Sequence, residues 1–150
     1  MKSQEESRRN PAVIKNLSRF IVQLGRLEKH PFVFGKAGPL TPGEIHTIEA
    51  IGPEGGVFMS EVAHRLAITK GAVTQMILRL EEKNLVRRTP NPADSRSTLV
   101  SLTAAGLEAY RAHEAMHLNF IRDLSSQLDE REIEIFDKCL EKLCRHLTTE

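Results

Sequence analysis

Two short helical patterns, joined by only a few residues, lie between Ser60 and Leu80 and restrict the fold more than any other feature. Ser60 can cap the first helix and Thr69 the second, because a hydroxyl at this position accepts a hydrogen bond from the first turn. This arrangement is typical of a helix-turn-helix. The apolar residues follow the helical period in both segments: Val62, Ala63 and Leu66, then Val73, Met76, Ile77 and Leu80.

Two β-prone runs follow the second helix, at residues 85–89 and 98–102. The eight residues between them, 90–97, are almost all turn formers, so we expect a hairpin with a long polar tip. Asn84 can end the preceding helix because asparagine tolerates the left-handed conformation. A hairpin directly after a helix-turn-helix is a wing.

Helical patterns flank this central region on both sides. Asn10 and Pro11 can start a first helix through about residue 30, and Thr41 with Glu44 has the spacing of a capping box. After the hairpin, one helix should start at Thr103 and a last one at Asp129. The predicted fold is mainly α with a small β wing. We expect a disordered segment 1–10 and a single domain 11–150, in which a winged helix-turn-helix (about 41–102) lies between helices 11–30 and 103–147.

Composition indicates an ordinary soluble protein, with 40% apolar and 27% charged residues among 150. No apolar run approaches the roughly 18 residues of a membrane span, and the first ten residues lack the apolar segment of a signal peptide. We therefore expect a cytoplasmic protein without membrane contact. Cys139 and Cys144 are five residues apart in a helical pattern, which suits neither a disulfide nor a metal pair, so we interpret them as reduced core thiols.

Charge is distributed unevenly along the chain. The net charge is +1, but residues 65–98 carry a local charge of +4, from seven basic and three acidic residues. A basic central third between acidic flanks is typical of a module that binds a polyanion. The basic residues are Arg65, Lys70, Arg79, Lys83, Arg87, Arg88 and Arg96.

The order of these elements, with the wing sequence Asp94-Ser95-Arg96-Ser97 and the following Leu102-Thr103-Ala104-Ala105-Gly106, resembles the MarR family of winged-helix transcription regulators. The passage from Leu80 to Arg88 is also similar to the helix-to-strand passage of that family, with Asn84 in place of its usual glycine. The resemblance runs from about Val13 to Leu147. It implies a repressor that binds a palindromic operator in double-stranded DNA.

The second helix of the helix-turn-helix has the chemistry of a DNA-reading helix. Its start at Thr69 offers backbone N–H groups and a positive dipole end to a phosphate. Gln75 suits adenine and Arg79 suits guanine, while Leu78 is an unexpected apolar residue in this polar stretch that would contact thymine methyl groups or pack against the wing. The resemblance implies that Arg96 enters the minor groove and that Asp94 orients its guanidinium. The predicted DNA-binding residues are Ser60, Thr69, Lys70, Gly71, Thr74, Gln75, Arg79, Arg88, Asp94 and Arg96.

The terminal helices carry more apolar residues than a small winged helix can bury. In the family that the chain resembles, these helices join two copies. A two-fold dimer would account for the excess and would match a palindromic operator. We therefore expect a homodimer.

A histidine pair suggests an effector site. His113 and His117 are four residues apart on one helix face, the spacing of a shared metal. Zinc-sensing members of the family imply two further ligands, Glu28 and His46. Segments around His46 and His113 also resemble the fatty-acid-synthesis repressors of the family, which respond to long acyl chains on acyl carrier protein. Three interpretations stay open: a hydrogen-bonded histidine cluster, a zinc or other divalent metal site, and a site for an acyl-type effector.

Two rival functions come from other classes. Three histidines and a carboxylate could form a zinc hydrolase, but the chain has no nucleophile elbow, no glycine-rich phosphate loop and no His-Glu-x-x-His motif, so we assign no catalytic residue. We therefore expect that the protein is not an enzyme. The second rival is a winged-helix module that binds another protein and no DNA. The salt dependence of binding separates these, because only phosphate contacts make binding fall steeply with salt.

Overall fold

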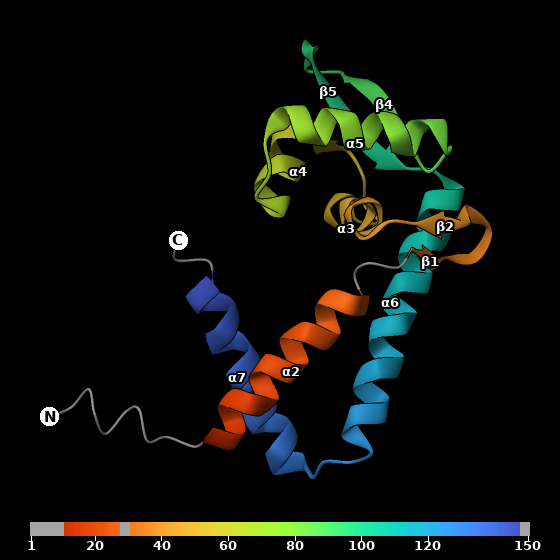
Figure 1. The fold of residues 1–150 in the computed structure, drawn as a ribbon. Coiled ribbons are helices and arrows are strands. Elements are labelled where there is room, and N and C mark those ends of the chain that lie inside the picture. The colour runs from red at the N-terminus through yellow and green to blue at the C-terminus, as the bar shows by residue number, and fades with distance from the viewer. Residues whose placement is uncertain (1–10, 28–30, 148–150) are drawn as a thin grey trace, which may run out of the picture. The chain divides into compact units, whose positions relative to one another are not determined.

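The computed structural model describes residues 11–27 and 31–147. The chain divides into two compact units, one up to Tyr110 and the other from Arg111. Within the described residues, no helix is long and apolar enough to span a membrane. Figure 1 shows the elements, which in chain order are α2 (Pro11–Leu27), β1 (Phe32–Val33), the short 3-10 helix η1 (Gly35–Ala37), β2 (Pro39–Leu40), α3 (Pro42–Ile51), β3 (Val57–Phe58), α4 (Met59–Leu66), α5 (Lys70–Glu82), β4 (Val86–Asn91), β5 (Asp94–Leu102), α6 (Ala104–Ser125) and α7 (Glu130–Leu147).

The core of the first unit lies among α3, α4, α5 and the three-stranded sheet. The helices contact one another in all three pairings, and α5 also contacts β4. The apolar side chains between these elements are buried, and their burial supplies most of the force that holds the three helices together. The core residues include Leu40, Ile45, Ile48, Ile51, Val62, Val73, Ile77, Leu80, Leu85, Val86 and Val100.

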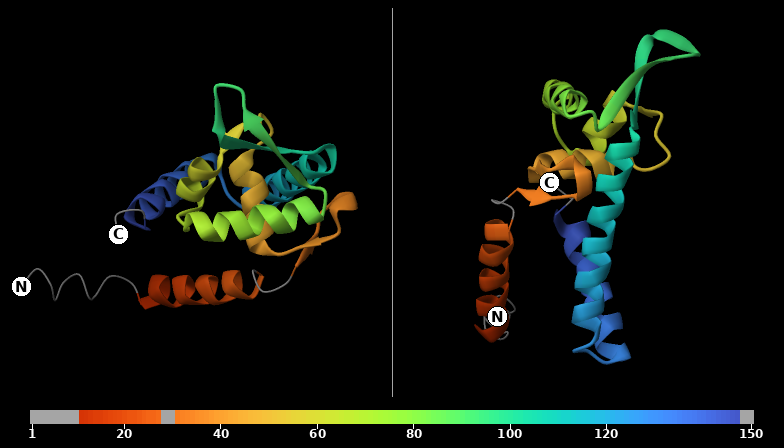
Figure 2. Two further views of the ribbon diagram at one scale, coloured as in Figure 1. Left: turned by 90° about the horizontal axis from the view of Figure 1, so that it is seen from above. Right: turned by 90° about the vertical axis from the view of Figure 1, so that its right-hand side faces the viewer.

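The wing is longer and its tip shorter than the sequence predicts. The strand order is β3-β5-β4, with both pairings antiparallel, and β4 and β5 are paired from Val86 with Leu102 out to Asn91 with Asp94. The prediction of a polar tip over 90–97 was wrong because β4 is the edge strand, where Pro90 is tolerated. The tip is closed by Asn91, which accepts a hydrogen bond from the Ala93 N–H at 3.0 Å. Figure 2 shows the β4–β5 hairpin extending beyond the helices of this unit.

Helix starts follow the predicted caps in four of five cases. Thr41 and Glu44 form a capping box at α3, the Thr69 hydroxyl accepts from the Ala72 N–H at α5, and Thr103 accepts from the Gly106 N–H at α6. At α7, the Asp129 N–H donates to the Glu132 carboxylate at 2.9 Å, and the Glu132 N–H donates to the Asp129 carboxylate at 2.8 Å. The fifth predicted cap, Ser60 at the start of α4, was wrong.

Ser60 is not a cap, because strand β3 leads directly into α4 and places Phe58 at the cap position. Ser60 is therefore an exposed residue in the first turn of α4. The predicted cap of the first helix, Asn10, lies outside the described residues, whereas Pro11 is the first residue of α2 as expected.

The junction from α5 through β4 to α6 depends on two residues with unusual backbone requirements. Asn84 has φ 56°, the left-handed conformation that ends a helix, and its carbonyl accepts a 2.6 Å hydrogen bond from the Thr103 hydroxyl. Gly106 lies so close to the Leu85 backbone that a Cβ would stand 1.9 Å from the Leu85 carbonyl oxygen. These contacts fix the start of α6 against the end of α5.

Apolar side chains line α2, α6 and α7 without being buried. Those of α2 are 43–61% exposed, and Phe120 on α6 is 61% exposed. Cys139 and Cys144 on α7 are both exposed, so the prediction of core thiols was wrong. The apolar period of α7 was identified correctly from the sequence, but the chain by itself does not bury that face. The exposed apolar residues include Val13, Ile14, Leu17, Phe20, Ile21, Val22 and Leu24 on α2, Leu118, Phe120 and Ile121 on α6, and Ile135, Leu140, Leu143 and Leu147 on α7.

Candidate nucleic-acid interface

Helix α5 has one buried face and one exposed face. Val73, Ile77 and Leu80 are completely buried, which fixes the rotation of the helix. The opposite face carries exposed residues at helical spacing, among them Gln75 and Leu78. The exposed DNA-facing candidates of α5 are Lys70, Gly71, Thr74, Gln75 and Arg79, as the sequence predicts.

The N-terminus of α5 is ordered by its own side chains. Thr69 caps the Ala72 N–H at 3.2 Å, and the Thr74 hydroxyl donates to the Lys70 carbonyl at 2.9 Å. The first N–H groups of a helix have no intrahelical partner and form the positive end of its dipole. With the exposed Lys70 ammonium beside them, they make this helix end suitable for a phosphate.

Arg96 lies near the tip of the wing and is exposed. Asp94 contacts Arg96 through the backbone: one carboxylate oxygen accepts from the Arg96 N–H at 3.0 Å. The recorded contact of Asp94 is therefore with the Arg96 backbone and not, as predicted, with its guanidinium. Asp94 instead shapes the turn that presents Arg96, and the Ser97 hydroxyl adds a 3.0 Å bond to the Asp94 carbonyl.

Arg88, in the middle of the wing, pairs with Glu81 of α5 at 2.8 Å. On β4, Arg88 lies opposite the buried Val100, while the exposed Arg87 lies on the other face of the strand. Among the predicted DNA contacts, Arg88 already has an ionic partner within the protein. This pair also links the wing to α5.

The C-terminal end of α5 is held to the start of α3 by an ion pair. The Lys83 ammonium lies 2.7 Å from Glu44, whose side chain is 5% exposed, and Glu44 also accepts from the Thr41 N–H at 2.8 Å. Burial raises the pKa of the Glu44 carboxyl, but the hydrogen bonds from Lys83 and Thr41 and the Lys83 charge together hold the pKa below its ordinary value. Glu44 is therefore ionised at neutral pH, and its ion pair with Lys83 anchors the C-terminal end of α5.

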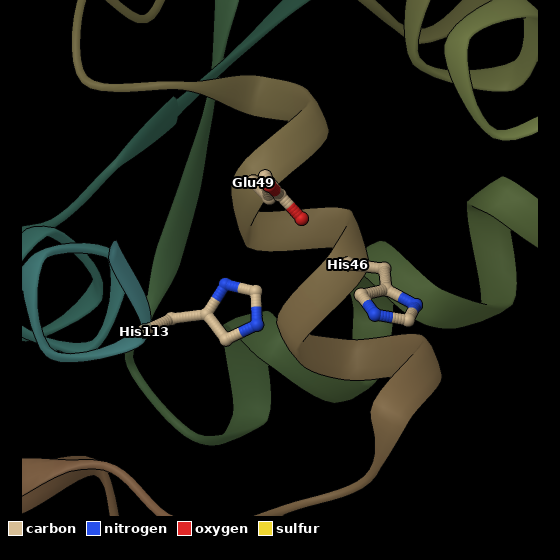
Figure 3. Close-up of side chains that lie close together, drawn as sticks. All are labelled: His46, Glu49 and His113. Atoms are coloured by element: carbon tan, nitrogen blue, oxygen red, sulfur yellow. The ribbon is translucent and has the colours of Figure 1, made fainter. Parts of the chain in front are cut away.

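The histidines that the sequence singles out lie on α3 and α6. His113 is buried, and its Nε2 lies 2.9 Å from Nε2 of His117, one turn further along α6. His46 and Glu49 are three residues apart on α3 and are exposed. His46, Glu49 and His113 each offer one ligand atom, and these atoms lie within 4.8 Å of one another (Figure 3). Glu28, the fourth predicted ligand, lies outside the described residues.

Comparisons with known proteins find similarity to transcription regulators over the central part of the chain. The model of the MarR family matches residues 39–97. The repressor MdtR of Bacillus subtilis is 34% identical over 91 residues, which are 56% of this chain and 59% of MdtR. The alignment therefore spans less than two thirds of the length of MdtR.

Solved structures agree in fold. FabT of Streptococcus pneumoniae, crystallised in complex with DNA, has a TM-score of 0.79 at 24% identity and covers 90% of this chain and 97% of FabT. The DNA complex of MepR from S. aureus has a TM-score of 0.59 at 25% identity and covers 72% of this chain and 78% of MepR. The match to the MarR family model covers the helix-turn-helix and most of the wing. The relatives are named as transcriptional regulators, in agreement with the prediction of a non-enzymatic protein.

Sequence reasoning missed two residues of interest. Glu49 joins the histidine group on α3, and its signal was available in the His46-x-x-Glu49 spacing, which places both side chains on one helix face. Glu44 was predicted only as a capping residue, whereas it also anchors Lys83 at the end of α5. No local signal identifies that second role, because Lys83 is 39 residues further along the chain.

Proposed function

We propose that this protein is a sequence-specific DNA-binding transcription regulator of the MarR family that acts as a repressor. The observation that carries the proposal is the division of α5 into two faces. One face is completely buried at Val73, Ile77 and Leu80, and the other presents polar side chains to solvent, while the wing carries the exposed Arg96. A helix of this kind fits the major groove, and a wing arginine fits the adjacent minor groove. The relatives named above, a repressor and two proteins crystallised with DNA, support this function.

The protein acts in this proposal as a homodimer on a palindromic operator. The support is the run of exposed apolar side chains on α2 and α7, such as Phe20 at 53% and Leu143 at 48% exposure. Contiguous exposed apolar surface marks an interaction site. Light scattering of the full chain should give about twice 16.9 kDa. A mass near 16.9 kDa at micromolar concentration would contradict the dimer.

DNA binding is tested by selection from a random double-stranded library, followed by titration of the selected site at several salt concentrations. The affinity should fall steeply with salt, because bound phosphates release counterions. Arg96→Ala should weaken binding by about tenfold and reduce the salt slope by about one. Arg111→Ala removes a charge of the same kind from α6 and serves as the matched control, with little expected change. A flat salt response, or a library from which no sequence is enriched, would favour a module that binds another protein.

A divalent metal, zinc above all, is the effector that the side chains favour. The support is the close group of His46, Glu49 and His113, because imidazole nitrogens and a carboxylate oxygen are ligands that zinc prefers. His117 contacts His113 through its Nε2 atom and offers a further possible metal ligand beside it. Metal binding would change the affinity for DNA through α3, which packs against α5.

Metal content of the untagged protein, purified without chelator and measured by mass spectrometry, tests this second proposal. About one zinc per chain is expected, with loss in His46→Ala and in Glu49→Gln. His64→Ala, which changes an exposed histidine of α4 outside the group, is the matched control. Protein without metal, and without zinc uptake on titration, would contradict the metal site and turn the search to acyl-type ligands, carried by acyl carrier protein or free. DNA titration with and without chelator then shows whether the metal strengthens or weakens binding.

A further inference from the structure

Three residues of α5 form a stripe along its exposed face. Gly71, Gln75 and Leu78 follow one another at spacings of four and three residues, so they share one side of the helix. Leu78 is 37% exposed, whereas its neighbour Ile77 is completely buried. The core of the protein is therefore complete without these three residues. We call them the base-reading stripe.

Leu78 is unusual on this face. The nearby exposed positions of α5, Thr74, Arg79 and Glu82, are polar or charged. An apolar side chain among them gains nothing from water, but it matches one feature of the major groove, which is the methyl group of thymine. Gln75, one turn earlier, has an amide that can pair with both N6 and N7 of adenine.

Gly71 lacks a reason within the protein to be glycine. Its φ is not in the left-handed region, and a Cβ at this position would meet nothing closer than the Thr69 hydroxyl at 3.9 Å. Gly106 shows the opposite case, because a Cβ there would collide with the Leu85 backbone. A glycine inside a helix weakens the helix, so its benefit at position 71 lies outside the chain. That benefit is a closer approach of the α5 backbone to a ligand.

We propose that the base-reading stripe is built for an adenine–thymine step in each half-site, with Gln75 on the adenine, Leu78 on a thymine methyl group and Gly71 admitting the DNA backbone or base edge. This inference rests on the proposed function and names the class of sequence that the protein reads. The preference for one base sequence then comes from hydrogen bonds between Gln75 and adenine at one position, and from the apolar contact of Leu78 with thymine at the next.

The test removes the methyl group alone. Sites are first selected from a random double-stranded library with the full chain, and each thymine of the enriched half-site is then replaced in turn by deoxyuridine. At one position the wild-type affinity should fall about fourfold, the value of one buried methyl group. Leu78→Ala should bind the thymine and deoxyuridine sites equally, because the partner of the methyl group is gone. Gln75→Ala should lose preference for adenine at the neighbouring position by tenfold or more.

The possible failures are distinguishable. If no sequence is enriched, the proposed function fails. If a sequence is enriched but deoxyuridine has no effect at any position, or Leu78→Ala is as sensitive to it as the wild type, this inference fails while DNA binding stands. Gly71→Ala provides a separate reading: its melting temperature should equal or exceed that of the wild type while its affinity for the selected site falls severalfold. An unchanged affinity would remove Gly71 from the stripe.

Discussion

Substitution of Gly106 by alanine should destabilise the protein through a single contact. The new Cβ would stand 1.9 Å from the Leu85 carbonyl oxygen and 2.9 Å from the Leu85 carbonyl carbon. Real Cβ atoms keep at least 3.0 Å from other heavy atoms, so the start of α6 and the Leu85 backbone must separate by about 3.0 − 1.9 = 1.1 Å. Neither partner is a flexible side chain, so the displacement falls on the backbone.

The cost follows from the hydrogen bonds at this junction. The Thr103 N–H donates to the same Leu85 carbonyl at 3.0 Å, and the Thr103 hydroxyl connects to the Asn84 carbonyl. A shift of this size breaks these two bonds, at about 1 kcal/mol each, and overpacking adds about 1–3 kcal/mol. The expected loss is therefore about 3–5 kcal/mol of the free energy of unfolding, which is a large share of the roughly 5–15 kcal/mol of a typical domain.

Urea unfolding followed by circular dichroism measures this loss. Gly71→Ala is the matched control, because it is the same change in a helix with no atom in the way, and it should raise the free energy of unfolding by about 0.5–1 kcal/mol. If Gly106→Ala cost less than about 1 kcal/mol, the junction would not be as tightly constrained as the distances indicate.

Substitutions at three further residues test the local structure around α5. Asn84→Ala should lower the free energy of unfolding by about 1 kcal/mol, because φ is 56° at this position, whereas Asn84→Gly should not lower it; equal losses would contradict the backbone argument. Thr69→Ala should cost about 1 kcal/mol through loss of the α5 cap, and an unchanged urea midpoint would refute that role. Glu44 has a lowered pKa in the folded state, so its contribution to stability is present above the unfolded-state pKa, near about 4.3, and is lost as the pH falls through the folded-state pKa. Glu44→Gln should therefore lose less stability than the wild type in urea titrations from about pH 6 to pH 3, and parallel curves would contradict the ion pair.

Features that depend on neighbours in the sequence were predictable. The capping box of Thr41 and Glu44, the cap at Thr69 and the left-handed Asn84 all act within a few residues, so their residue types suffice to identify them. The resemblance in the wing added the MarR family, whose model matches residues 39–97. The fold class followed from these signals together.

Features that depend on tertiary position were not predictable. Whether Pro90 can sit in a strand is decided by the place of β4 at the edge of the sheet, which the sequence does not reveal. Cys139 is exposed because none of the described segments covers its side of α7, although the helical period is the one expected for a buried face. The His46-x-x-Glu49 spacing predicts that these two side chains share a helix face, but Glu49 meets His113 only after folding, since the two are 64 positions apart in the sequence.

The two faces of α5 should respond independently to mutation. Its rotation is set by completely buried residues such as Val73 and Ile77, and its C-terminal end by the pair of Lys83 with Glu44. None of these contacts uses Gln75, which is exposed. Gln75→Arg should therefore leave the free energy of unfolding within about 0.5 kcal/mol of the wild type. In the selected operator the same variant should shift the preferred base from adenine toward guanine, because arginine pairs with guanine O6 and N7. Selection with this variant measures the shift, and an unchanged sequence preference with intact binding would show that Gln75 does not read a base.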